Sequence, residues 1–79
     1  MKNMSIFPNP SHDELNITLS GANQEQAWLL IVDIKGNLVG EDKNFLIGST
    51  YNVSALSHGN YYVCLIHENR NYVKPFIKN

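Results

Sequence analysis

The residues best able to do chemistry are three histidines, His12, His58 and His67, and a single thiol, Cys64. A zinc site needs about four ligands, usually grouped at short spacings. The closest pair, Cys64 and His67, is three residues apart on a segment with strand-like alternation, so the two side chains point to opposite faces. We therefore expect no metal site and no cofactor, and we expect the histidines to be ordinary surface or turn residues.

Covalent and acid–base catalysis are equally poorly supported. Cys64 and His58 have the residue types of a nucleophile and its base, but the sequence offers no oxyanion-hole element and no third orienting group. The adjacent carboxylates Asp13–Glu14 and Glu41–Asp42 point apart in an extended chain, so we expect them to be solvated loop charges. We predict that the domain has no catalytic residue and is not an enzyme.

Length and charge restrict the class of protein further. The chain has 79 residues, of which 43% are hydrophobic and 16% are charged, as in one small folded domain. The net charge of −1 leaves no basic field for nucleic acid. The lone cysteine cannot form an intrachain disulfide. We expect a single monomeric domain over residues 1–79, in which residues 1–4 are a linker or cloning remnant.

Apolar residues that recur with a period of two predict strands along most of the chain. The alternation is clear over residues 15–20 and 61–66, whereas residues 27–32 form a continuous apolar run, typical of a central strand covered on both faces. Asp33 and Gly36 predict a tight turn after this run, because aspartate accepts backbone N–H groups and glycine permits positive φ. The expected core consists of Leu15, Ile17, Leu19, Leu29, Ile31, Tyr61, Val63 and Leu65. Cys64 should then lie on the outward face.

Turn signals recur roughly every ten residues, and no segment shows the period of a helix. This pattern predicts an all-β fold, an antiparallel β-sandwich of six or seven short strands. Two features leave alternatives open. The four tyrosines on expected strands, Tyr51, Tyr61, Tyr62 and Tyr72, are either core and rim residues or an exposed sugar-binding stripe. The final segment, residues 72–79, is either a solvated edge strand or a recognition tag.

Four segments of the chain, taken together, resemble a known family. They are Ile6–Pro10 continuing into Leu15–Ile17, then Val32–Val39, then Tyr51–Val63, and last Val73–Lys78. In this order, at these spacings and ending at the terminus, the segments resemble the C-terminal sorting domain of cargo proteins of the bacterial type IX (Por) secretion system. The resemblance extends over residues 5 to 79.

This resemblance implies an immunoglobulin-like sandwich of about seven strands at the C-terminus of a larger exported protein from Bacteroidetes. The implied partners are the fused upstream cargo, the outer-membrane secretion machinery, and a sortase that removes the domain and attaches the cargo to the surface. The implied location is the periplasm in transit, then the cell surface or the extracellular space. The domain is then a secretion signal and a sortase substrate, and it needs no cofactor.

Eight residues match the family's motifs and are expected to take part in recognition: Pro8, Asn9 and Pro10 in the first motif, Gly59 and Tyr61 in the Gly-x-Tyr motif, and Lys74, Phe76 and Lys78 in the terminal motif. The first five also have structural explanations, because prolines fix the start of a strand, glycine permits a turn and tyrosine fills a core. For the lysines the resemblance favours recognition.

Alternation in the terminal segment places the two lysines on one face and Val73 and Ile77 on the other, which we expect to be exposed charges and core anchors respectively. Pro75 departs from the family pattern and removes one backbone donor from this strand. Two rival functions remain: a glycan-binding or adhesion module that uses exposed aromatic rings, and an immunoglobulin-like spacer.

Overall fold

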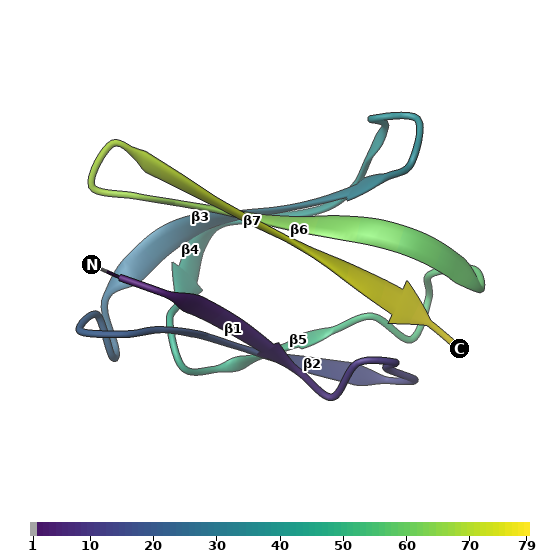
Figure 1. The fold of residues 1–79 in the computed structure, drawn as a ribbon, viewed down its shortest axis with the longest axis horizontal. Helices are drawn as coiled ribbons and strands as arrows, with labels where there is room; N and C mark the ends of the chain where they lie inside the picture. Colours follow the sequence, from purple (N-terminus) through teal and green to yellow (C-terminus); the bar gives the residue numbers. More distant parts are fainter. Residues whose placement is uncertain (1) are drawn as a thin grey trace.

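The computed structural model describes residues 2–79, which form seven β-strands and no helix. The strands are β1 (Met4–Phe7), β2 (Glu14–Leu19), β3 (Gln26–Asp33), β4 (Leu38–Leu46), β5 (Thr50–Asn52), β6 (Gly59–His67) and β7 (Arg70–Lys78). One antiparallel sheet has the order β1-β2-β5 and the other β4-β3-β6-β7. The two sheets stack face to face (Figure 1). The predicted all-β sandwich is confirmed.

Nothing in residues 2–79 forms a helix of the length and apolar character needed to cross a bilayer. The fold begins at Met4, inside the segment that was expected to be a linker, and the Met4 side chain is buried. Met1, which belongs to the same expected linker, lies outside the described residues. The sandwich therefore uses the chain almost from its start.

The core lies between the two sheets, and all eight core residues predicted from the alternation are buried. Period-two strands send every second side chain inward, which is why the pattern identified them. The remaining buried apolar residues are Met4, Ala22, Ala27, Phe45, Ile47, Val53 and Phe76. Tyr51 and Tyr72 pack against this core as partly buried residues.

Strand β3 lies between β4 and β6, as the prediction of a central strand required. The expectation that it is covered on both faces is wrong. Trp28 is 40% exposed, and Leu30 and Val32 are only partly buried. An antiparallel sheet packs one face on the core and leaves the other to water, so an apolar run does not require two covered faces.

The turn between β3 and β4 forms as predicted. One carboxylate oxygen of Asp33 accepts hydrogen bonds from the backbone N–H groups of Lys35 and Asn37, both at 2.9 Å. Gly36 has a φ of +86°, which only glycine adopts without strain. The hydrogen bonds, with that from Asn37 foremost, lower the pKa of the Asp33 carboxyl.

Strand β4 is longer than the sequence predicted. Its pairing with β3 contains register shifts, which interrupt the alternation of apolar residues by which a strand is recognised in a sequence. Glu41 and Asp42 lie within this strand, so their assignment to a loop was wrong; Glu14 likewise begins β2. The Glu41 carboxylate accepts a hydrogen bond of 2.7 Å from the Trp28 indole N–H. The Lys43 ammonium lies 5.8 Å from the centre of the same ring.

Cys64 lies on the outward face of β6 as predicted, between the buried residues Val63 and Leu65. Its side chain is half-buried rather than fully exposed. Desolvation by this partial burial raises the pKa of the thiol, which reduces its thiolate fraction at neutral pH.

Candidate functional site

The inner face of β7 is built around Phe76. This side chain is 1% exposed and stacks on Tyr61 of β6, with the ring centres 5.3 Å apart and the ring planes at 23°. Phe76 and Tyr61 are also opposite each other in the β6–β7 register. Offset aromatic stacking adds to the free energy of burial, so this pair fixes which face of β7 points inward.

The Gly-x-Tyr motif supports this pair from the start of β6. The Tyr61 hydroxyl donates a hydrogen bond of 2.7 Å to the backbone oxygen of Ser57, which ties the ring to the loop before the strand. Gly59 has a φ of +151°, a conformation that side-chain-bearing residues rarely adopt. Gly59 pairs with Lys78, so the motif lies directly against the end of the chain.

The Pro8–Ser11 loop binds the outer edge of β7. The Asn9 side chain accepts a hydrogen bond of 2.9 Å from the Ile77 N–H and donates one of 3.3 Å to the Pro75 oxygen. The Ser11 N–H donates a hydrogen bond to the Ile77 backbone oxygen, and the Ser11 backbone oxygen accepts one from the Asn79 N–H, both at 2.9 Å. The loop thus occupies the edge of the C-terminal half of β7 as a neighbouring strand would.

The N-terminal half of the same edge is open. The backbone N–H and C=O groups of Ile77 point away from β6. Successive residues of a strand direct these groups to alternate sides, so the backbone groups of Val73 and Asn71 point to the same outer edge as those of Ile77. Within residues 2–79, no segment supplies them with a backbone partner. Pro75 belongs to this set, so its missing N–H faces the edge and removes no bond from the β6–β7 ladder.

The expected division of the terminal strand into exposed lysines and core anchors is wrong. Val73 and Ile77 are 57% and 45% exposed, whereas Lys78 is only 7% exposed. The Lys78 ammonium donates a hydrogen bond of 3.1 Å to the backbone oxygen of Asn79. Stacking of Phe76 on Tyr61 turns the lysine-bearing face inward; of the two lysines on that face, Lys74 stays exposed and Lys78 is buried.

The structure therefore brings the three motif segments together at one place. Tyr61 and Phe76 lie beneath β7, the Pro8–Pro10 segment lies along its edge, and the outward side chains of β7 lie on the surface. We call the surface formed by the outward side chains of Val73, Pro75 and Ile77, together with Asn9 at the edge, the β7 surface; the exposed Lys74 projects from the other face of the strand. Sequence reasoning missed Val73 and Ile77 as surface residues, because both alternating sets of this strand mix apolar and polar residues.

One family of proteins matches the chain, over residues 5–79, and it is described as the secretion system C-terminal sorting domain. The chain belongs to this family. It is a C-terminal sorting domain of the type IX secretion system, the kind of tail by which that system recognises secreted cargo. Such a signal directs export toward the cell surface or the extracellular space, and the family is known as non-catalytic. No curated protein matches the chain.

Three of the four tyrosines of the sorting domain are buried or pack against the core. Tyr61 is buried, Tyr51 and Tyr72 pack against the core, and only Tyr62 is a large exposed tyrosine. Tyr51, Tyr61 and Tyr72 are therefore core and rim residues, and they do not contribute to an exposed sugar-binding stripe.

One histidine of the sorting domain departs from expectation. His67 is 5% exposed and lies at the inward end of β6, so its assignment to the surface was wrong. It follows Leu65 by two residues, so the alternation that identified the core placed it inward as well. His12 and His58 are exposed, as expected.

Proposed function

We propose that this sorting domain directs an upstream cargo protein across the outer membrane, and that the type IX machinery reads the β7 surface of the folded domain. In this proposal the cargo passes through the periplasm, a sortase then removes the domain, and the cargo becomes attached to the cell surface. The domain acts as a monomeric signal and a sortase substrate, without a catalytic role of its own.

The convergence of the three motif segments on β7 is the observation that carries this proposal. The first segment is separated from the other two by more than half of the chain, yet Asn9 bonds to the last strand, and Tyr61 stacks on Phe76 within that strand. Packing alone requires Tyr61 and Phe76. It does not require exposed apolar side chains at Val73 and Ile77 beside an open strand edge. A partner protein would use both of these features.

The terminal lysines take different parts in this proposal. Lys74 is exposed and offers the positive charge that a complementary acidic partner would contact, while discouraging non-specific strand pairing. Lys78 is buried and holds the backbone of Asn79, so it sets the shape of the chain end. A single exposed charge contact contributes about 1 kcal/mol or less, so apolar and backbone contacts must supply most of the recognition.

Fusion of the domain to a periplasmic reporter tests the assigned function. The reporter should reach the cell surface only when it carries the domain and only in a host with an intact type IX system. Mass spectrometry of the surface-exposed reporter should show that the domain has been removed. The matched controls are the reporter without the domain and the fusion in a host that lacks the secretion pore. Equal surface exposure in all three strains would contradict the proposal.

A further inference from the structure

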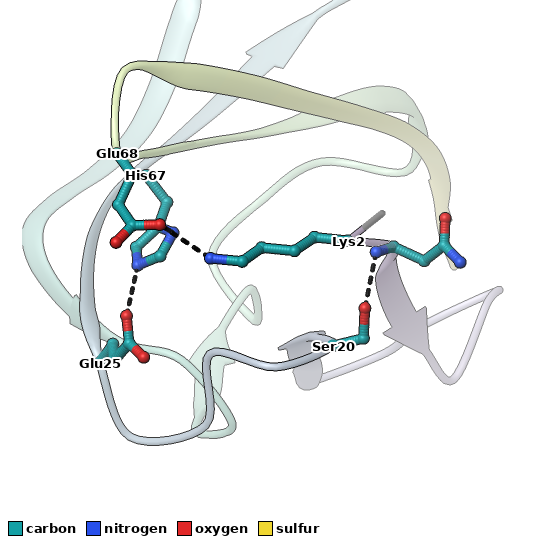
Figure 2. A network of polar contacts seen from close by, with 6 residues as sticks. Lys2, Ser20, Glu25, His67 and Glu68 are labelled. Carbon is teal, nitrogen blue, oxygen red and sulfur yellow. Dashed lines mark hydrogen bonds and ion pairs between the residues drawn. The ribbon is translucent and has the colours of Figure 1, made fainter.

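His67 is held at the end of β6 against a carboxylate. Its Nε2 atom lies 2.8 Å from the Glu25 Oε1 atom, and its side chain is only 4% exposed. Figure 2 shows the ring between Glu25, in the loop before β3, and Glu68, in the turn after β6. Because a carboxylate only accepts hydrogen bonds, the Nε2 atom of the neutral ring must carry the proton.

That tautomer leaves a lone pair on the other ring nitrogen, Nδ1. The Nδ1 atom of His67 is buried and has no hydrogen-bond partner. The Glu68 Oε1 atom lies 3.7 Å from it, which is too long for a hydrogen bond. Two acceptors thus face each other across a gap, an arrangement that a cation between them would stabilise.

The gap has the size of a metal bridge. Bonds of about 2.0–2.2 Å from zinc to an imidazole nitrogen and to a carboxylate oxygen would together span 3.7 Å with a bent geometry. Glu25 takes the place of the outer carboxylate that commonly orients a metal-bound histidine through its second N–H. One ligand atom each from Glu25, His67 and Glu68 lie within 4.8 Å of one another.

Lys2 is the group that an ion would have to displace. Its ammonium lies 2.8 Å from Glu68 Oε1, and its side chain is 31% exposed (Figure 2). Exposed ion pairs contribute little to stability, so this lysine can move into solvent at small cost. A surface pocket of about 330 Å³, lined by Lys2, Glu68, Arg70 and Tyr72, adjoins the site and gives room for water ligands.

We propose that the His67 Nδ1 atom and the Glu68 carboxylate bind a zinc-type divalent cation, with Glu25 as the positioning residue behind the imidazole. The imidazole ligand favours zinc over calcium and magnesium, which prefer oxygen ligands. The ion joins the end of β6 to the β6–β7 turn and supplies the cation that the buried Nδ1 atom lacks. None of the proposed ligands belongs to the β7 surface, so the site does not depend on the proposed secretion role.

Thermal unfolding with zinc sulfate tests the site, using the chain without a histidine tag. At a free zinc concentration about five times Kd, the melting temperature should rise by roughly 4–8 °C. The variant Glu68→Gln should bind zinc at least about tenfold more weakly, because it removes a ligand on the exposed turn without changing the core. His67→Gln should behave likewise. Titration calorimetry measures the affinities, and calcium chloride should give no rise.

One of the two exposed histidines and the thiol provide matched controls. His58→Gln and Cys64→Ser should retain the full zinc response. Absence of any response to millimolar zinc would overturn the proposal. A zinc response of Glu68→Gln and His67→Gln equal to that of the wild-type chain would also overturn it, because it would mean adventitious surface binding only. Stabilisation that appears on acidification but not with zinc would also overturn it, because a proton would then fill the gap.

Discussion

At the scale of single residues, the inner face of β6 is part of the core between the two sheets. Leu65 is fully buried, whereas the neighbouring Ile66 lies on the outer face and is partly exposed. Leu65→Ala should therefore lower the free energy of unfolding by about 2–5 kcal/mol, measured by urea denaturation. Ile66→Ala is the control and should cost clearly less. A loss below about 1 kcal/mol for Leu65→Ala would mean that this face does not pack as described.

The Asp33 turn gives the stability a defined pH dependence. The pKa of Asp33 is lowered in the folded state, mainly by the Asn37 N–H, so the ionised carboxylate favours folding. The contribution of the Asp33 carboxylate to the free energy of unfolding is complete above the pKa of the unfolded state. It is lost as the pH falls through the pKa of the folded state. Asp33→Asn should therefore reduce the melting temperature at neutral pH, and the difference from wild type should shrink near about pH 2. A difference that stays constant would contradict this assignment.

Cys64 should react with a thiol reagent in the native protein, because its side chain lies on the outer face of β6. Partial burial raises its pKa, so the reaction should be slower than that of an unstructured cysteine at the same pH. Native-state labelling followed by mass spectrometry measures both rates. Labelling that requires denaturant would contradict the outward placement.

At the scale of elements, the loop before β2 holds β7 in place. Asn9→Ala removes both side-chain hydrogen bonds to the β7 backbone, so it should destabilise the domain by about 1–2 kcal/mol. Amide exchange at Ile77, which loses its acceptor, should accelerate more than exchange at residues in β3. Asn71→Ala is the matched control, because Asn71 is exposed on the open half of the same edge. Unchanged exchange at Ile77 in Asn9→Ala would show that Asn9 does not hold this edge.

Most elements were predictable from the sequence because their alternation is unambiguous. In β2 one alternating set is wholly apolar and the other is polar, so the buried face follows from the residues alone; in β6 the set with Val63 and Leu65 is the more strongly apolar of the two sets. In β7 one set holds Lys74, Phe76 and Lys78 and the other holds Val73, Pro75 and Ile77, so neither is clearly the core set. The stacking of Phe76 on Tyr61 decides the matter, and that contact depends on the register of β7 against β6.

The contacts around His67 and β7 could not be predicted for a similar reason. Glu25 and His67 are 42 residues apart, and Asn9 and Ile77 are 68 apart, so only the tertiary fold brings them together. The motif residues were found through family resemblance. The hydrogen bonds by which Asn9 holds the edge of β7 leave no local signal in the sequence.

At the scale of the whole molecule, the last strand is both part of the core and part of the candidate recognition site. Deletion of residues 74–79 would remove Phe76 and its stacking on Tyr61, so it would unfold the sandwich as well as remove the signal. A truncation therefore cannot separate the two roles of β7. Substitutions of outward side chains can do so, because they leave the core and the β6–β7 ladder intact.

The most direct measurement is the surface exposure of a reporter fused to the domain that carries Val73→Asp and Ile77→Asp. Both side chains are exposed on β7, and Ile34→Asp provides a matched exposed apolar position outside β7, in the β3–β4 turn. A charge placed at two central contact positions of a recognition surface should cost more than about 1.4 kcal/mol in total, so the double variant should lower surface exposure about tenfold or more. Ile34→Asp should export normally, and urea melts should show that both variants fold. Wild-type export of the folded double variant would contradict the claim that the machinery reads β7.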